Sequence, residues 1–600
     1  MSAFIQLLSR PYQWILLKTK TRQGSLTLTA GVLFFVANLA LIYPALLPDL
    51  ADINPWDESV YIHSGQMIFN GEWQNFAGNP LAAIFYALTY LPFSKSPYWF
   101  VYSCALGRVI LFALLWLSAC LFASQVTTGK DGQKLPLPAV MAGFLLVSPF
   151  ITPMLRFPSD PLFASLAGFS LWQIMLYKNT RLLKHIWLAS LFLGLATLAR
   201  NDGLLMFPIL AAVVIILSIS AKQWLRTIPA VALPFAAVVG GYILFFGLLT
   251  GRFEMGTMGR TYDNFEAGHQ AIYNVSGGIN PVAEAKLEAR RAFGTPEENN
   301  LSVFNAIQRN PKVYLQRLLI TVKQLPDQIL HAYGIRFAPV LFLLAARGIL
   351  ALLRSRQYGL LLILFIWPTH LASGLIITLF REGHLLFHFY IMLSLAITGL
   401  VAILENIANP RERIAWGVVL VGAALYGILD AKLAIFYGVS IFLIALLAIY
   451  AIRNQVGERP EVTLAALFIF LCAGLVIHGS YPSPTSRVLG DDAKEQALVY
   501  MWENLDRGEK VAGGAPGMVW AAQMTFINMS SPDVPVHRDS QQFYDWMVSQ
   551  GVRAVYVDHS LYNDSPAVWE LIKAQIGTGL TRVFSGDEGD IQVLLLQPDQ

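Results

Sequence analysis

The chain has 600 residues, of which 55% are hydrophobic and only 13% are charged. Soluble domains usually carry about 25% charged residues, so a chain this apolar needs lipid as its solvent. The net charge of +4 indicates no nucleic-acid partner, because a duplex-binding face needs clustered lysines and arginines. The three cysteines lie in apolar runs without metal-ligand spacing, which argues against a disulfide framework.

Apolar segments recur along most of the chain. A helix that crosses a membrane needs about 20 apolar residues, and the sequence predicts about thirteen such spans. They are Ser25–Leu47, Trp99–Ala123, Leu137–Ile151, Pro161–Tyr177, His185–Ala199, Leu204–Ser220, Ile228–Leu249, Phe337–Leu353, Gly359–Phe380, Leu385–Leu404, Ile414–Leu429, Ala431–Ile452 and Val462–His478.

The basic residues of the short loops predict an orientation. With thirteen spans, loops on one side hold most lysines and arginines. Loops on the other side hold only Lys95, Arg156, Arg200, Arg381 and Lys432. Because cytoplasmic loops carry the excess of positive charge, the N-terminus is predicted inside. The first outer loop (48–98), a long outer loop (251–336) and the tail (480–600) are then outside, and residues 1–479 form the membrane domain.

The first outer loop opens with the sequence "WDESVYIH", which carries Asp57, Glu58, Tyr61 and His63. Apolar residues follow at three- and four-residue spacing, and Asn79-Pro80 begins a second apolar helix. Both helices are expected to lie flat in the membrane interface. The alternative for the two acids is a capping role, with Asp57 as N-cap and Glu58 in the first turn.

Two further polar groups occur on the same predicted side. In "MLRFPSDPLF", Asp160 precedes Pro161 and Arg156 lies one turn before it; the alternative for Asp160 is again an N-cap. Two outward acids could divide the duties of base and orienting group. The "LARNDGLL" sequence carries Arg200 and Asp202, and Asn-Asp-Gly favours a turn between two helices.

The "FREGHLLFHFYIM" sequence places Arg381, His384 and His388 at an outer membrane boundary. The two histidines are one helical turn apart, which is compatible with a zinc pair, although the glutamate of HExxH is missing. The favoured interpretation is a polar cavity, in which Arg381 suits a phosphate because its fork binds two oxygens.

The long outer loop and the tail differ from the spans. The loop mixes polar and aromatic residues in "TYDNFEAGHQAIYN", and we expect it to close over a substrate; the alternative is a plain connector. In the tail, "DDAKEQALVYMWENL" and "SQQFYDWMVSQ" read as helices, and "KVAGGAP" and "VRAVYV" as strands. This alternation predicts a small α/β domain.

Taken in order, these motifs resemble the GT-C superfamily of integral-membrane glycosyltransferases. They look most like its users of polyprenyl-phosphate sugars, such as protein O-mannosyltransferase-like enzymes and lipid A aminoarabinose transferases. The resemblance rests on the acidic "WDES", the acid after the third span, the "RNDG" turn, the long loop before the eighth span and "REGHLLFHFY".

The resemblance implies transfer of a hexosyl or pentosyl group from a polyprenyl-phosphate donor to a glycan, lipid or protein acceptor. Asp57 would be the catalytic base, with Glu58 beside it and Asp160 as the second acid. Donor phosphate or substrate would contact a set drawn from both outer loops and the later motif: Arg156, Arg200, Arg381, His384, His388, Tyr61 and His63. Gly383-His384 departs from the basic-aromatic pair common in such enzymes.

The sequence also leaves open functions other than sugar transfer by this family. A transporter or flippase of lipid-linked sugars predicts charges near the membrane midplane, and Arg108 and Arg347 lie within apolar spans. A polymerase or ligase of another fold and a non-catalytic assembly protein remain as alternatives. No cofactor is certain, and a divalent metal on Asp57 and Asp160 is left open. The expected location is a bacterial inner or plasma membrane, with the site on the outer face.

Overall fold

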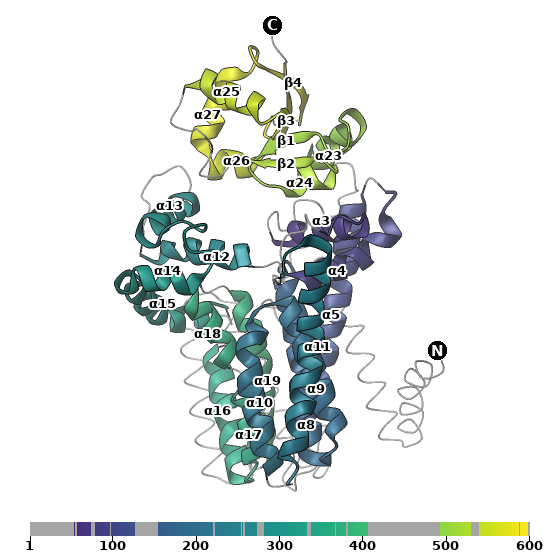
Figure 1. Cartoon of the computed structure of the whole chain (residues 1–600), viewed down its shortest axis with the longest axis vertical. Coiled ribbons are helices and arrows are strands. Elements are labelled where there is room, and N and C mark those ends of the chain that lie inside the picture. Colours follow the sequence, from purple (N-terminus) through teal and green to yellow (C-terminus); the bar gives the residue numbers. More distant parts are fainter. Residues whose placement is uncertain are drawn as a thin grey trace, which may run out of the picture.

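The structure is a computed structural model. It describes residues 53, 57–73, 79–96, 98–126, 154–219, 222–253, 255, 258–272, 281–332, 338–366, 368–379, 382–405, 493–529, 534, 539–586 and 589–597. Within them, long helices form a bundle, and shorter helices and a sheet cover one end of it (Figure 1).

The bundle consists of α5 (Trp99–Val126), α8 (Ser159–Thr180), α9 (Leu183–Ala199), α10 (Asp202–Ile219), α11 (Trp224–Thr250), α16 (Ala338–Arg354), α17 (Tyr358–Leu364), α18 (Pro368–Ile376) and α19 (Leu386–Glu405). Among the described helices, α5, α10 and α11 are long and apolar enough to cross a membrane. These helices and the composition make the chain an integral membrane protein. The total of thirteen spans stays a prediction.

One predicted span is wrong. The described residues between 359 and 380 form two short helices, α17 (Tyr358–Leu364) and α18 (Pro368–Ile376), instead of one continuous helix. The second begins at Pro368, whose ring removes a backbone donor and disfavours a helical residue before it. The spans expected at 25–47, 137–151, 414–429, 431–452 and 462–478 lie outside the described residues.

Two glycines let α16 and α19 approach closely. A Cβ atom added at Gly348 would overlap the carbonyl oxygen of Leu395, and one added at Gly399 would overlap that of Leu344. Small residues at a helix contact let the two backbones meet in this way. In lipid no hydrophobic effect drives helices together, so helix association depends on such close packing.

The described basic loops meet at one end of the bundle. Lys178 Nζ donates to Gln357 Oε1 at 2.8 Å, and Arg181 Nη1 donates to the Leu217 carbonyl at 2.5 Å. These contacts join the end of α8 and the α8–α9 loop to the start of α17 and the end of α10. The opposite end carries the outer helices and the sheet (Figure 1). The charge separation agrees with the predicted sidedness, although the orientation in a membrane stays a prediction.

The first outer loop forms α3 (Asp57–Phe69), α4 (Pro80–Tyr90) and η1 (Leu91–Phe93). The prediction that Pro80 begins a helix is confirmed. The expectation of a one-sided interfacial helix is wrong for α3, because its polar Ser59 and Gln66 are buried together with its apolar residues. Contacts with α4, α5 and the tail enclose α3 from several sides.

The long outer loop also folds. It forms α12 (Met258–Ala267), η2 (Gly268–Ala271), α13 (Pro281–Phe293), α14 (Val303–Arg309) and α15 (Pro311–Ala332). Tyr262, Phe265, Phe293 and Ala306 form a core of their own. The plain-connector interpretation is therefore wrong for the described part of this loop. Between α18 and α19, the chain forms η3 (Glu382–Leu385).

The tail forms a mixed five-stranded sheet in the order β2-β1-β3-β5-β4. Its elements are α23 (Ala493–Asn504), β1 (Lys510–Gly513), α24 (Gly517–Ala521), β2 (Thr525–Asn528), α25 (Ser540–Ser549), β3 (Val552–Val557), α26 (His559–Asp564), α27 (Pro566–Gln575), β4 (Leu580–Ser585) and β5 (Gln592–Leu596). The predicted helices and strands of the tail are confirmed, and Gly551 follows α25 with a φ of +69°.

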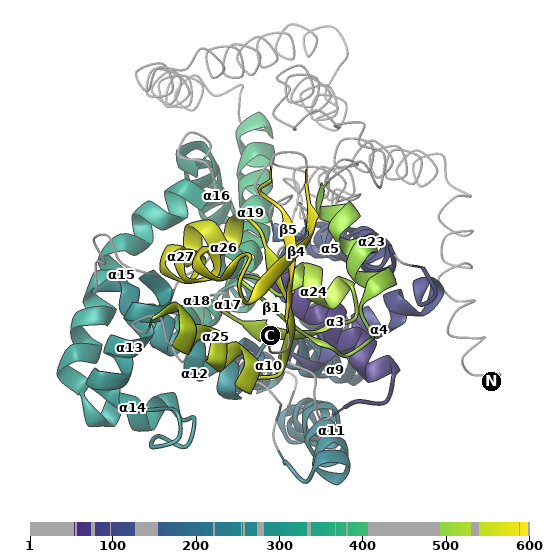
Figure 2. The ribbon, with the colours of Figure 1, turned by 90° about the horizontal axis from the view of Figure 1, so that it is seen from above.

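The tail packs directly on the first outer loop. The indole Nε1 of Trp99 donates to the Ala521 carbonyl at 3.1 Å, and the rings of His63 and Trp520 stack with centroids 4.6 Å apart. Seen from above, the sheet and its helices lie over the end of the bundle, while α12–α15 curve around one side (Figure 2). The tail therefore covers at least α3 and the start of α5 at this end of the bundle.

Candidate functional site

The candidate site is a polar cluster around Arg200 at the covered end of the bundle. Arg200 lies between α9 and α10 in an extended conformation, with φ −154° and ψ 136°. The predicted helix-to-helix turn is confirmed. The turn directs the guanidinium toward two carboxylates and a histidine, because Arg200 interrupts both helices instead of continuing either.

The guanidinium of Arg200 holds three partners. Its Nε donates to Asp202 Oδ2 at 2.6 Å, its Nη1 donates to Asp160 Oδ1, and its Nη2 is 2.7 Å from His384 Nε2. Arginine has no acceptor, so His384 Nε2 must accept this hydrogen bond and carries no hydrogen in this arrangement. The cluster thus joins the start of α8, the α9–α10 turn and η3.

Asp160 is fixed from two directions. It lies in the first turn of α8, whose N-cap residue is Pro158, so the N-cap alternative for Asp160 is wrong. A Cβ atom added at Gly383 would overlap the Asp160 carboxylate. Only a residue without a side chain lets η3 approach Asp160 this closely, which gives a structural reason for glycine in "REGHLL".

Arg200 retains hydrogen-bonding capacity. A guanidinium has five N–H donors, and three of them are used by Asp202, Asp160 and His384. Two donors, one on each terminal nitrogen, have no partner among the residues that the structure describes. The side chain is 17% exposed, against 7% for Asp160. A partly exposed arginine with two spare donors can bind a pair of anionic oxygens.

Glu58 is part of a separate, sealed ion pair. Arg108 of α5 donates from Nε to Glu58 Oε1 at 2.8 Å and from Nη2 to Glu58 Oε2 at 2.6 Å. Cys104 Sγ lies 3.0 Å from the same Oε1. The Arg108 and Glu58 side chains are 2% and 0% exposed. Sequence reasoning missed this pairing; the available signal was an arginine alone in an apolar span.

The remaining predicted residues are dispersed. Asp57 is the first residue of α3 and is partly exposed. The Tyr61 hydroxyl accepts from Asn79 Nδ2 at 2.9 Å, and His63 stacks on Trp520. Arg156 is exposed, and His388 is buried one turn after His384. Arg381 lies outside the described residues.

A metal site would need several His, Cys, Asp or Glu side chains close together. In this part of the chain, no group of three or more His, Cys, Asp or Glu side chains is arranged to hold a metal ion. The Nε2 atom of His384 is engaged by Arg200, so a zinc ion at that nitrogen would have to displace the arginine. The divalent metal considered from the sequence stays a prediction.

No protein-family model matches the chain, and no curated protein matches its sequence. Solved structures do match its fold, and two of them are of one protein. ArnT from Cupriavidus metallidurans bound to undecaprenyl phosphate superimposes with a TM-score of 0.56 and 14% identity, covering 95% of this chain and 99% of that one. The apo state of the same protein gives a TM-score of 0.52 at the same identity and coverage. The expected polytopic, mostly helical membrane fold is therefore confirmed, while the number of spans stays a prediction.

Proposed function

We propose that the chain is a membrane glycosyltransferase that moves a sugar from a polyprenyl-phosphate donor to an extracytoplasmic acceptor. The observation that carries the proposal is the Arg200 cluster, assembled at the covered end of a fold shared with ArnT. That ArnT structure holds undecaprenyl phosphate, which is a polyprenyl phosphate. A phosphate-bearing lipid needs donors of the kind that Arg200 retains.

The proposed reaction is a single displacement. An acceptor hydroxyl oxygen attacks the anomeric carbon of the donor sugar, and the bond from that carbon to the phosphate oxygen breaks. Asp57 removes the hydroxyl proton, and polyprenyl phosphate leaves with the electron pair. One displacement inverts the anomeric configuration.

Arg200 is assigned to the leaving phosphate. Negative charge develops there as the bond breaks, and fixed N–H donors stabilise it without reorganisation. Asp160, Asp202 and His384 hold the guanidinium in place from three sides. Arg381, next to η3 in the chain, is proposed as a second cation for this phosphate.

Glu58 is assigned a positioning role instead of a catalytic one. Its carboxylate is enclosed by Arg108 and Cys104, which fixes the first turn of α3 to α5. Successive residues of an α-helix point about 100° apart, so anchoring Glu58 inward leaves Asp57 facing another direction. Asp57 is partly exposed there, as a base that receives a proton from a substrate must be.

The sidedness follows from the loop charges. The end with Lys178 and Arg181 is assigned to the cytoplasm, which places the Arg200 cluster on the outer face of a bacterial inner membrane. A polyprenyl-phosphate donor keeps its tail in lipid and its phosphate at the interface. The cluster lies at the bundle end where this phosphate would arrive.

The decisive variant is Asp57→Asn. Purified protein in nanodiscs is given undecaprenyl-phosphate sugars and acceptors from a bacterial membrane extract, and release of undecaprenyl phosphate is measured. General-base loss lowers turnover by roughly 10²–10⁴-fold. Asp57 is the first residue of α3, so the N-cap alternative for it is wrong, and Asn keeps the size of Asp in this first turn at little cost in stability. We expect turnover to collapse while thermal melting stays near that of the wild type.

A matched control comes from the tail. Asp539 is a genuine N-cap, whose side chain accepts from the Gln542 N–H at 2.8 Å. Asp539→Asn should change neither turnover nor melting. If Asp57→Asn keeps more than about a tenth of wild-type turnover, Asp57 is not the base. A flippase would move the donor between leaflets without releasing undecaprenyl phosphate at all.

A further inference from the structure

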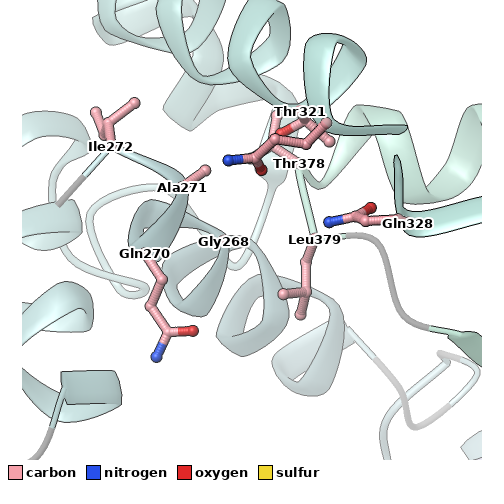
Figure 3. A pocket seen from close by; sticks show the side chains of 9 residues that line it. Gly268, Gln270, Ala271, Ile272, Thr321, Gln328, Thr378 and Leu379 are labelled. Atoms are coloured by element: carbon pink, nitrogen blue, oxygen red, sulfur yellow. The ribbon is translucent and has the colours of Figure 1, made fainter. Parts of the chain in front are cut away.

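A second polar pocket lies in the outer helices, where α15, η2 and the segment after α18 meet. Its volume is about 370 Å³. Figure 3 shows Gln270, Ala271 and Ile272 on one side, with Thr321, Thr378 and Gln328 facing them across the pocket. None of these residues belongs to the Arg200 cluster.

The lining is polar but uncharged. Amide side chains come from Gln270, Gln324 and Gln328, and hydroxyl groups come from Thr321 and Thr378. No charged side chain lines the pocket among the residues that the structure describes. The Gln328 Oε1 atom is buried and has no hydrogen-bond partner within the described chain. Buried polar atoms nearly always have partners, so hydrogen-bonding capacity is left unused beside the pocket by the described residues.

Four polar residues of α15, three of which line the pocket, lie on one face of the helix. Arg317, Thr321, Gln324 and Gln328 are spaced by four, three and four residues, which brings them onto the same side of the helix. Thr321 and Thr378 are both 3% exposed, while Gln324 is exposed. The stripe therefore runs from the buried base of the pocket to its exposed rim.

Arg317 holds the base of the pocket in shape. Its Nη2 donates to the Phe265 carbonyl at 2.6 Å and to Thr378 Oγ1 at 2.5 Å, and its guanidinium lies 4.4 Å from the Phe265 ring centroid. A Cβ atom at Gly268 would be 2.6 Å from Arg317 Nη2, so the close approach requires glycine. Arg317 itself does not line the pocket.

Thr378 has an unusual backbone. Its φ of 53° is in the left-handed region, which a β-branched residue rarely adopts. Such strain persists only where the surroundings enforce it, and it is concentrated at functional sites. Here Arg317 binds its hydroxyl, and Thr378 lines the pocket.

The pocket is close to the Arg200 cluster along the chain. Leu379 lines the pocket, and Gly383 touches Asp160. Four residues of fully extended chain span at most about 14 Å. A molecule seated in the pocket is therefore within reach of the cluster if it is longer than a single small group.

We infer that this pocket is a carbohydrate subsite that binds a neutral sugar unit of the acceptor. The inference rests on the proposed function and narrows its acceptor to a glycan-bearing molecule. Amides and hydroxyls recognise sugar hydroxyls, whereas a phosphate would call for charged donors on the lining. The donor is held by its tail in the bilayer, so the outer helices suit the acceptor better.

The test uses direct binding. Wild-type protein and Asp57→Asn, both in nanodiscs free of sugar-headed detergent, are titrated with D-mannose, D-galactose, N-acetyl-D-glucosamine and inorganic phosphate. Saturation-transfer NMR reports binding. We expect at least one sugar to bind both proteins, and Gln324→Leu/Gln328→Leu to weaken that binding about tenfold or more, as loss of two hydrogen bonds implies.

The matched control is Gln316→Leu, which removes an exposed amide of α15 that does not line the pocket. It should leave sugar binding unchanged. Absence of binding by all three sugars, equal binding by the double variant, or phosphate binding that the double variant abolishes would overturn the inference. Sugar binding without donor turnover would overturn the proposed function instead, because the Asp57→Asn comparison separates binding from reaction.

Discussion

Two arginine–carboxylate pairs at the same end of the bundle differ in how completely they are closed. Arg108 and Glu58 are 2% and 0% exposed and use two parallel hydrogen bonds. Arg200 and Asp160 are 17% and 7% exposed, and Arg200 divides its donors among three partners. The first arrangement has no room for a ligand, and the second keeps two donors and access to them.

We expect this difference to separate a structural pair from the cluster that is proposed to be functional. A buried pair with good geometry roughly repays its desolvation, but removal of one partner leaves an uncompensated charge. A partly exposed cluster tolerates the loss of a partner better, because water can replace it. The two pairs should therefore respond to substitution in opposite ways: the closed pair through stability, and the open cluster through turnover.

The largest expected effect is that of Arg108→Gln on stability. It leaves the Glu58 carboxylate buried without its counter-ion, which typically costs about 3–5 kcal/mol. Melting in nanodiscs should fall strongly, and little folded protein should be recovered. Glu58→Gln/Arg108→Gln removes both charges and should melt well above the single variant. If the double variant is no more stable than Arg108→Gln, the two side chains are not coupled and the closed-pair interpretation is wrong.

Arg200→Lys should have the opposite profile. Lysine keeps the charge but loses the planar fork that holds three partners and a phosphate. Loss of one preorganised donor to a developing anion lowers turnover by roughly 10²–10³-fold. Release of undecaprenyl phosphate measures this loss, and melting should change little. A fall in melting as large as that of Arg108→Gln, with turnover retained, would make Arg200 a second structural arginine.

The sequence predicted the helices and turns that carry these residues better than it predicted which arginine contacts which carboxylate. Local patterns identified the helices, the Asn-Asp-Gly turn and the acids at helix starts, because periodicity and turn chemistry act over a few residues. Glu58 and Arg108, however, are 50 residues apart, and no local pattern connects them. Their contact depends on how α3 packs on α5, which only the assembled fold determines.

The same limit explains the other differences. The contact of His63 with Trp520 joins residues that are far apart in the chain. The tail therefore helps to bury α3, which the sequence predicted to lie flat in the membrane interface. The break before Pro368 was locally readable, since proline interrupts a helix, but overall hydropathy concealed it. The role of Gly383 became visible only with Asp160 beside it.

Gly383→Ala sharpens the comparison by disturbing the open cluster alone. The added Cβ would overlap the Asp160 carboxylate, so either η3 or the acid must move. A displacement of about 1 Å in a catalytic group can cost up to about 10²-fold in rate. We expect a loss of turnover of that order or smaller. Gly240→Ala is the control, since an added Cβ there meets nothing within 4 Å. Equal turnover in the two variants would show that η3 does not position Asp160.

The smallest expected effect concerns the contact between the tail and α3. Burial lowers the pKa of His63 to about 4 from an ordinary value of 6.5, although its bond to Gln66 raises it. Between these two pH values the unfolded chain binds a proton that the folded chain does not, so stability is full above pH 6.5 and falls as the pH drops toward 4. His63→Phe keeps a flat ring against Trp520 but cannot titrate. The melting temperature should fall less between pH 7 and pH 4.5 in this variant than in the wild type.

Burial, with the charge of Arg317, also lowers the pKa of His269 to about 4. His269 is present in both proteins, so the difference isolates His63. If acid lowers the melting of both proteins equally, the contact between the tail and α3 does not depend on a neutral His63.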